Sequence, residues 1–383
     1  MSLRGRSRGT NLKVSAMSSD FDIKDSIMKI HPYTPGESKI DTSFPLRQLA
    51  ANEAPLGPSP KAVEAAQDSL VTANRYPDGG AMALRAKISE RFGFPAENLI
   101  CGAGSDELIS LICTAFADDD AEVLYSQHGF LMYKISALAA GATPVAAPET
   151  DLRMNVDNMI AALTDRTRVV FVANPNNPTG SYSTGEELAR LHAALPPSTL
   201  LVIDAAYSEY VDADDYSDGS DLVAAHSNVM MTRTFSKLFG LAALRIGWGY
   251  ASEDVIAILN RVRGPFNVSV PAQAAATAAL DDWDWAMNAK ELNNRLLPVV
   301  IQRIRGMGLQ VYDSVGNFVL IDFSSAERST AADAYLRSQG VIGRSVAAYG
   351  LASCLRMTIG TEADMDFIFG ALERFIDSES KGA

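Results

Sequence analysis

A regular alternation of short apolar strands with helical stretches, from residue 98 onwards, constrains the fold most strongly. The strand candidates have β-branched and aliphatic centres, which is typical of strands buried on both faces of a sheet. They are Asn98–Cys101, Glu122–Tyr125, Thr143–Ala147, Arg168–Ala173, Thr199–Asp204, Asn228–Thr232 and Leu244–Tyr250. The pattern predicts an α/β fold in which helices cover both faces of the sheet.

The pattern changes after Pro271, where a smaller α+β domain is predicted. A helical segment from Ala272 to Arg305, interrupted near Pro298, comes first. Strands at Leu309–Tyr312, Phe318–Phe323 and Cys354–Ile359 follow, with helices near Ala326–Gln339 and Asp364–Asp377. Because a chain of 383 residues is too long for one simple hydrophobic core, we divide it into an extension and arm (1–47), a large domain (48–271) and a small domain (272–383).

Composition excludes several classes of function. The formal charge of −13 disfavours nucleic acid and anionic membrane surfaces as partners. Three scattered cysteines without a C-x-x-C pair indicate a reducing cytoplasm, and four separated histidines predict no metal site. No apolar run reaches the about 20 residues of a membrane helix. The first 19 residues are basic and lack the apolar core of a secretory signal, which leaves a transit-like peptide, a disordered extension or a start codon upstream of the true one.

The stretch from Thr232 to Trp248 carries the first chemical signal, with Thr234, Ser236, Lys237 and Arg245 in an otherwise apolar loop between two strands. A single lysine there would ordinarily extend along the surface. Its amine can also form an imine, while the two hydroxyls and the guanidinium can hold a phosphate dianion. Burial would lower the pKa of the lysine and favour that chemistry.

Two further clusters follow the ends of predicted strands. Asn174-Pro-Asn-Asn-Pro-Thr-Gly180 taken alone is typical of a turn. Asp204-Ala-Ala-Tyr207 places an acid at the carboxyl end of a buried strand, where open α/β sheets bind ligands. A buried acid needs a cationic partner, and a pyridinium N–H would serve.

In their order along the chain, the three clusters resemble the fold-type I aminotransferases of class I/II, which depend on pyridoxal 5′-phosphate (PLP). The resemblance implies a large domain with a mainly parallel seven-stranded sheet, a smaller α+β C-terminal domain, and PLP as cofactor. It implies that Lys237 binds PLP as a Schiff base and then moves the substrate proton. Asp204 would pair with the ring nitrogen, and Asn177 and Tyr207 would bond the phenolic oxygen.

The segment Gly102-Ala-Gly-Ser-Asp-Glu107, predicted as a turn before a helix at Glu107–Phe116, allows two interpretations. A dinucleotide fingerprint would need glycine at its sixth position, which is Glu107, and an acid after the next strand, which is absent. A phosphate cradle fits better, because the N–H groups of Ser105 and Asp106 would face an anion at a helix N-terminus. The aminotransferase family uses G-x-x-S-D-E in this way.

The resemblance also implies roles for two aromatic residues. Phe130 occupies the position of the aromatic side chain that stacks on the pyridine ring, although a core role is the ordinary alternative. Tyr76 matches a residue that reaches the cofactor phosphate of the neighbouring subunit. The active sites would then be shared within a homodimer.

Substrate preference is indicated by motifs outside the cofactor shell. His31–Gly36, Leu49–Ser59 and the Gly102 segment are similar to the histidinol-phosphate aminotransferase subfamily. That similarity implies that Arg356 holds the substrate carboxylate or lies near the alcohol of histidinol phosphate, and that Arg344 binds the substrate phosphate. A surface ion pair is the alternative for each arginine. Two more residues, Tyr33 and Asn52, are expected to line the substrate pocket.

The expected activity is ping-pong transamination between histidinol phosphate and 2-oxoglutarate in histidine biosynthesis, in the cytoplasm. An aromatic amino-acid aminotransferase and a threonine-phosphate decarboxylase would share every cofactor residue and remain alternatives. A nicotinamide-dependent dehydrogenase is disfavoured by the incomplete glycine motif. A non-catalytic PLP-binding regulator is disfavoured by the acidic composition and by the lack of a DNA-binding extension.

Overall fold

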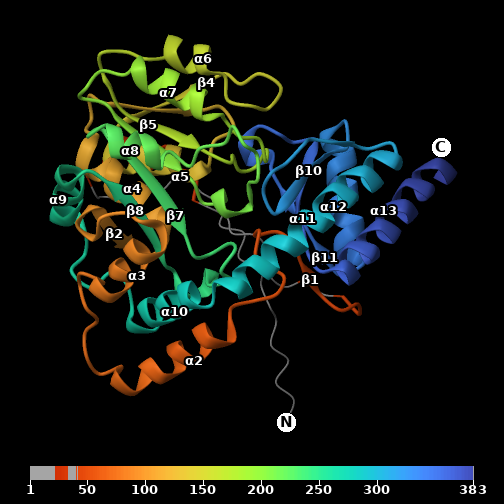
Figure 1. Cartoon of the computed structure of the whole chain (residues 1–383). Helices are drawn as coiled ribbons and strands as arrows, with labels where there is room; N and C mark the ends of the chain where they lie inside the picture. Colours follow the sequence, from red (N-terminus) through yellow and green to blue (C-terminus); the bar gives the residue numbers. More distant parts are fainter. Residues whose placement is uncertain (1–21, 33–39, 41, 383) are drawn as a thin grey trace.

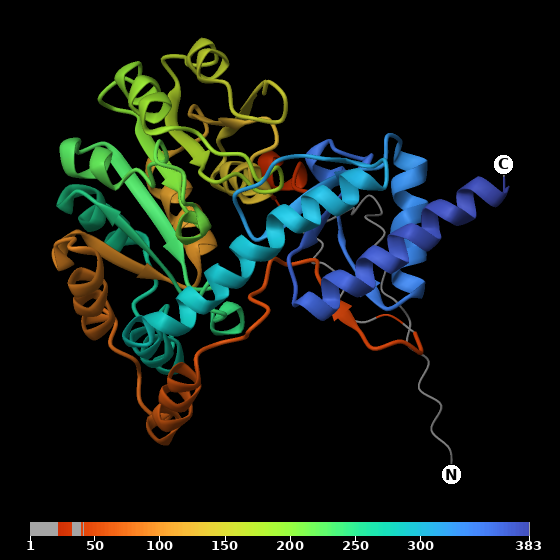
Figure 2. The same ribbon diagram turned by 45° about the vertical axis from the view of Figure 1, so that its right-hand side comes forward.

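The computed structural model describes residues 22–32, 40 and 42–382 (Figure 1). A larger α/β unit and a smaller α+β unit lie side by side. The long helix α11 (Trp283–Gly306) runs from one unit to the other, as Figure 2 shows after rotation. None of the helices in these described ranges is long and apolar enough to cross a membrane.

The large unit is built on a seven-stranded sheet with the strand order β2-β8-β7-β6-β5-β3-β4. All neighbouring pairs from β7 to β4 are parallel, whereas β8 runs antiparallel to both β2 and β7. The strands are β2 (Leu99–Gly102), β3 (Glu122–Ser126), β4 (Thr143–Ala147), β5 (Thr167–Ala173), β6 (Leu200–Asp204), β7 (Val229–Thr234) and β8 (Gly247–Ala251). The predicted mainly parallel seven-stranded sheet is confirmed.

Alternate residues of the central strands enter two separate cores, which explains their continuous apolar sequence. In β5, Val170 and Val172 join one core, and Val169 and Phe171 join the other. The first core lies under α3 (Met82–Phe92), α6 (Val156–Ala161), α7 (Gly185–Ala193), α8 (Ser220–Ala225) and α10 (Val270–Asp281), with α2 (Pro60–Ser69) packed on α10. The second lies under α4 (Ser105–Phe116), α5 (Leu131–Ala140) and α9 (Glu253–Val262). Helices therefore cover both faces, as expected.

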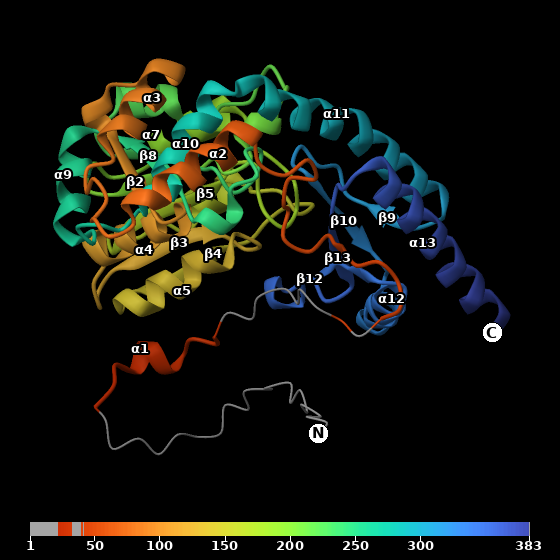
Figure 3. The ribbon, with the colours of Figure 1, turned by 90° about the horizontal axis from the view of Figure 1, so that it is seen from below.

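The small unit contains an antiparallel sheet of order β12-β13-β10-β9. Its strands are β9 (Gln310–Val311), β10 (Phe318–Asp322), β12 (Arg344–Ser345) and β13 (Cys354–Thr358), covered by α11, α12 (Ala326–Ser338) and α13 (Glu362–Gly382). From the N-terminal segment, which also carries α1 (Asp25–Met28), β1 (Arg47–Gln48) pairs in parallel with β11 (Val341–Ile342). Figure 3 shows α1 on the side of the large unit that carries α5, and these two helices are in contact. The domain boundaries themselves stay a prediction.

Two details of the predicted elements are wrong. The helical segment from Ala272 is broken at Asp282, where the backbone leaves the helical region (φ −101°, ψ 47°), and α11 continues through Pro298. A proline removes one N–H donor, but its fixed φ is compatible with helix, and packing of α11 holds the remaining turns together. The strand predicted from Leu244 begins only at Gly247, because Ala242–Leu244 form a 3₁₀ turn and Arg245 is left-handed (φ 54°).

Candidate active site

A cavity of about 380 Å³ lies at the carboxyl ends of β5, β6 and β7, and side chains from both units line it. Loops that follow parallel strands converge at this edge of an α/β sheet. The cavity brings together thirteen predicted site residues: Asn52, Ser105, Asp106, Phe130, Asn177, Asp204, Tyr207, Thr234, Ser236, Lys237, Arg245, Arg344 and Arg356. Residues that lie more than 300 positions apart in sequence thus face one space.

Lys237 extends its amine into the cavity. Its Nζ donates a hydrogen bond to the Ala51 carbonyl (2.8 Å) and lies 5.7 Å from the ring centroid of Tyr207. Burial, with a smaller contribution from the Arg356 guanidinium, lowers the pKa of Lys237 from 10.5 to about 7. Near neutral pH a large fraction of this amine is therefore uncharged and nucleophilic.

One end of the cavity is suited to a phosphate group. Helix α4 begins at Ser105, two residues earlier than predicted, so its first N–H groups point at this end. Arg245 binds Asp106 Oδ1 through Nη2 (2.7 Å) and donates to the Ser236 hydroxyl through Nη1 (3.3 Å). The left-handed backbone of Arg245, which ended the predicted strand, accompanies these contacts.

Glycine is required at two positions around this cradle. Gly104 has φ +87°, and a Cβ on it would lie 2.4 Å from Arg245 Nη2. A Cβ on Gly247 would lie 2.5 Å from the Ser105 nitrogen. Side chains here would fill the space between the helix N-terminus and the guanidinium. The donor set of N–H groups, hydroxyls and one arginine therefore fits a bound phosphate dianion.

The other end holds Asp204, which is 6% exposed at the end of β6. Its Oδ2 accepts from the Tyr133 hydroxyl (2.8 Å) and its Oδ1 from the Thr232 hydroxyl (3.4 Å). Burial raises the pKa of this carboxyl above 3.8, and no ion pair to it occurs within the part of the chain that the structure describes. A buried acid with neutral donors only is suited to a ligand that brings its own positive N–H.

Polar side chains of the cavity also contact one another. Arg356 of β13, 6% exposed, donates through Nη1 to Asn177 Oδ1 and through Nη2 to the Ala50 carbonyl (2.5 Å). Asn52, fully buried, donates its amide to the Tyr207 hydroxyl (2.8 Å). Arg356 of the small unit and Asn52 therefore contact the two residues that were predicted to face the phenolic oxygen of the cofactor.

The two arginines that were predicted to bind the anionic groups of the substrate lie opposite each other. Arg344 in β12 and Arg356 in β13 are direct partners across the antiparallel pair, and both line the cavity. Directly opposed residues project from the same face of a sheet. Two guanidinium groups in one cavity are suited to substrates that carry anionic groups such as a carboxylate or a phosphate.

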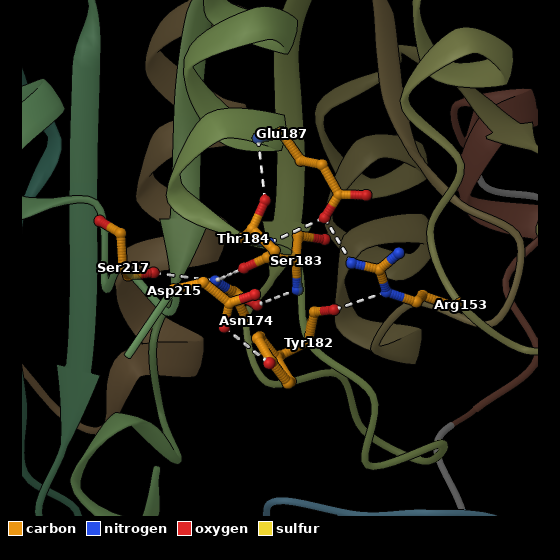
Figure 4. A network of polar contacts seen from close by, with 8 residues as sticks. All are labelled: Arg153, Asn174, Tyr182, Ser183, Thr184, Glu187, Asp215 and Ser217. Carbon is orange, nitrogen blue, oxygen red and sulfur yellow. Dashed lines mark hydrogen bonds and ion pairs between the residues drawn. The ribbon is translucent and has the colours of Figure 1, made fainter. Parts of the chain in front are cut away.

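The residues on either side of the loop that carries Asn177 take part in a separate network of polar contacts, which Figure 4 shows. The Asn174 side chain accepts from the Ser183 N–H (2.7 Å) and donates to the Ser183 and Ser217 carbonyls (3.1 and 2.9 Å). Arg153 donates to the Tyr182 carbonyl (2.9 Å) and pairs with Glu187, which also caps α7. These bonds hold both ends of the loop, so the backbone that carries Asn177 is fixed in position.

Sequence reasoning missed several residues of the site. Tyr133 lies in the first turn of α5, where its aliphatic neighbours indicate a core position. Its spacing of three from Phe130 was the available signal, because such residues lie on one helix face. Glu53 and Tyr349 line the cavity, and the ring of His128 lies 2.7 Å from the Tyr349 carbonyl.

Two predicted site residues are not among those lining the cavity. Tyr76 is 82% exposed and stacks on Phe266 with ring centroids 4.6 Å apart. Tyr33 lies outside the described residues. Among the residues the structure does describe, no group of three histidine, cysteine or acidic side chains could hold a metal ion.

Fold and site together define an aminotransferase: the chain belongs to the aminotransferase class I and II family, whose model matches residues 46–372. It is 50% identical to a histidinol-phosphate aminotransferase of Paramagnetospirillum magneticum over 92% of this chain and 98% of that protein. It is 52% identical to one of Rhodospirillum centenum, over 90% of this chain and 96% of the relative. These matches confirm the resemblance and the predicted enzyme class.

A solved structure gives the same result for the fold. The histidinol-phosphate aminotransferase of Sinorhizobium meliloti in complex with pyridoxal-5′-phosphate superposes with a TM-score of 0.86. The sequence identity is 28%, and the match covers 95% of this chain and 100% of that one. The predicted fold class is confirmed, and the nicotinamide-dependent alternative is excluded by the family.

Proposed function

We propose that this chain is a PLP-dependent transaminase that moves the amino group between L-histidinol phosphate and 2-oxoglutarate, as a step of histidine biosynthesis. The observation that carries the proposal is one cavity that is lined by Lys237, by Asp204 and by the opposed pair Arg344 and Arg356. Support comes from relatives named histidinol-phosphate aminotransferase that are 50% and 52% identical over at least 90% of this chain.

PLP, when bound, supplies a ring that withdraws electrons from the substrate carbon bearing the amino group. The uncharged Lys237 amine accepts the proton from that carbon and then donates it to the cofactor. Asp204 would balance the positive charge of the ring nitrogen, and Phe130 would pack against the ring. Ser105, Asp106, Thr234, Ser236 and Arg245 would hold the cofactor phosphate.

Substrate selection follows from the two arginines that line the cavity. Arg344 binds the phosphate of histidinol phosphate, and Arg356 binds the carboxylate of glutamate in the other half of the cycle. Since both substrates leave and enter through one cavity, the same guanidinium groups serve both half-reactions. The amino group lost by one substrate is gained by the other, so the cofactor is unchanged after a full cycle.

A steady-state assay tests the substrate assignment. Glutamate formation from 2-oxoglutarate is measured with histidinol phosphate, phenylalanine or threonine phosphate as donor, for wild type and Lys237→Ala. We expect kcat/KM for histidinol phosphate to exceed that for phenylalanine at least tenfold, and no turnover in the variant. A preference for phenylalanine would assign the chain to aromatic aminotransferases instead, and CO2 release from threonine phosphate would indicate the decarboxylase.

The enzyme works as a cytoplasmic homodimer in this proposal, with Tyr76 reaching the cofactor phosphate of the second subunit. The support is that Tyr76 is 82% exposed and stacks on Phe266, which is itself 46% exposed. Exposed apolar groups of this kind mark interaction surfaces.

Subunit mixing tests this arrangement. Lys237→Ala protein should be inactive and Tyr76→Ala protein weakly active, and a mixed dimer regains one intact site if Tyr76 acts on the other subunit's cofactor. Recovery of about a quarter of wild-type activity after random mixing is expected, because half of the dimers are mixed and each has one complete site. No recovery, or a monomer in light scattering, would contradict the shared site.

A further inference from the structure

Tyr133 contacts Asp204 without being among the residues that line the cavity. We propose that Tyr133 is a positioning residue that orients the Asp204 carboxylate through its hydrogen bond, and thereby sets how tightly the protein holds the positively charged ring nitrogen of PLP. This inference rests on the proposed function for the identity of the cofactor, and it assigns a role to a side chain that does not itself touch the cofactor.

The position of the Tyr133 hydroxyl is fixed by its surroundings. The side chain is fully buried, and its ring stacks on Phe171 with centroids 4.6 Å apart and planes 3° from parallel. The ring of Phe130 meets it edge-on at 6.0 Å. Phe171 belongs to β5 and Asp204 to β6, which are neighbouring parallel strands. A phenol clamped between two rings presents its hydroxyl at one place, and that place is 2.8 Å from Asp204 Oδ2.

Tyr133 is also the best-placed side-chain donor to Asp204 within the described chain. The Thr232 hydroxyl donates to Oδ1 over 3.4 Å, which is near the limit of a hydrogen bond. Because Asp204 is buried, its carboxylate depends on such donors for the solvation that water would otherwise give. Removing the Tyr133 hydroxyl leaves Oδ2 without that donor and favours the neutral acid.

The donor keeps its proton at every working pH. Burial and the adjacent Asp204 raise the pKa of Tyr133 well above 10. The bond therefore always runs from a neutral phenol to the carboxylate, and the single negative charge remains available for a cationic ring nitrogen. A histidine or lysine in this place could instead compete for that charge.

The test compares Tyr133→Phe with Tyr125→Phe. Both remove the hydroxyl of a buried tyrosine in the same core, and the two rings lie 6.2 Å apart, but only Tyr133 bonds Asp204. Full-length protein is stripped of cofactor and titrated with PLP from pH 5.5 to 8.5. We expect the PLP dissociation constant to rise about tenfold in Tyr133→Phe. The loss should be largest at low pH, because more of Asp204 is then protonated than in wild type; Tyr125→Phe should match wild type.

A double-mutant cycle separates positioning from general damage. If Tyr133 acts through Asp204, Tyr133→Phe should have no further effect on PLP affinity in an Asp204→Asn background. Additive losses, or an unchanged affinity and pH profile in Tyr133→Phe, would overturn the inference. A wild type that does not bind PLP would overturn the proposed function as well, whereas binding without transamination of histidinol phosphate would overturn only the substrate assignment.

Discussion

The low pKa of Lys237 has a direct consequence for its reactivity in the cofactor-free protein. With a pKa of about 7, roughly three-quarters of the amine is uncharged at about pH 7.5, against about 0.1% for an ordinary lysine. The structure therefore predicts an increase of several hundredfold in available nucleophile at this one residue. Burial is the largest cause, so most of the shift should survive substitution of neighbouring charges.

Competitive acetylation with a mass-spectrometric readout measures this property residue by residue. Trace acetic anhydride is added to cofactor-free protein between pH 5.5 and 10.5, and the labelling of each lysine peptide is followed. Lys61 and Lys87 are internal controls, because hydrogen bonds to acidic side chains raise their pKa above 10.5. We expect Lys237 to titrate near pH 7, well before both controls.

Arg356→Gln tests the electrostatic part of the reasoning. Arg356 is the second-largest cause of the shift, so its removal should raise the pKa of Lys237 while leaving it below 10.5. The controls should not move. Labelling of Lys237 only above pH 9, together with Lys61, would refute the argument from burial. An unchanged titration in Arg356→Gln would refute the contribution of the guanidinium.

Three further substitutions test other parts of the site. Asp204→Asn should make the cofactor-free protein more stable than wild type in urea at pH 8, and the difference in stability should be smaller near pH 4. Because the pKa of Asp204 is raised in the folded state, wild type loses stability as the pH rises above 3.8, whereas the amide does not titrate. Equal stabilities at pH 8 would contradict this. Arg344→Gln should raise KM for histidinol phosphate at least tenfold with a smaller effect on glutamate; equal effects on both would argue against phosphate recognition. Asn174→Ala removes three hydrogen bonds of a fully buried side chain and should cost about 2–3 kcal/mol of unfolding free energy in urea titrations. Tyr182→Phe, which removes one exposed bond to Asp215, should cost less than about 1 kcal/mol, and similar losses in both would refute the assigned importance of the loop base.

The sheet was predictable because its signal is local. Continuous apolar runs such as Arg168–Ala173 are needed wherever a strand is buried on both faces, and the structure places their alternate residues in two cores. The cavity was predictable because Asn177, Asp204 and Lys237 follow consecutive parallel strands, whose ends meet at one edge.

Other features depend on tertiary contacts that no local pattern records. Tyr133 resembles any aromatic of a buried helix until Asp204 is placed beside its hydroxyl. The left-handed Arg245 contradicts the strand propensity of its neighbours because the guanidinium contacts Asp106, 139 positions away. The short β12 carries too few residues for a periodic signal, and its position opposite β13 is what pairs Arg344 with Arg356.

Half-reaction spectroscopy on the purified, PLP-loaded protein tests the central claim most directly. Histidinol phosphate, glutamate and phenylalanine are added separately without a keto acid, and the absorbance band of the bound cofactor is followed over time. Rapid conversion to the aminated cofactor by histidinol phosphate and by glutamate, well ahead of phenylalanine, is the predicted result. Conversion by phenylalanine alone, or no cofactor band in wild type, would contradict the account.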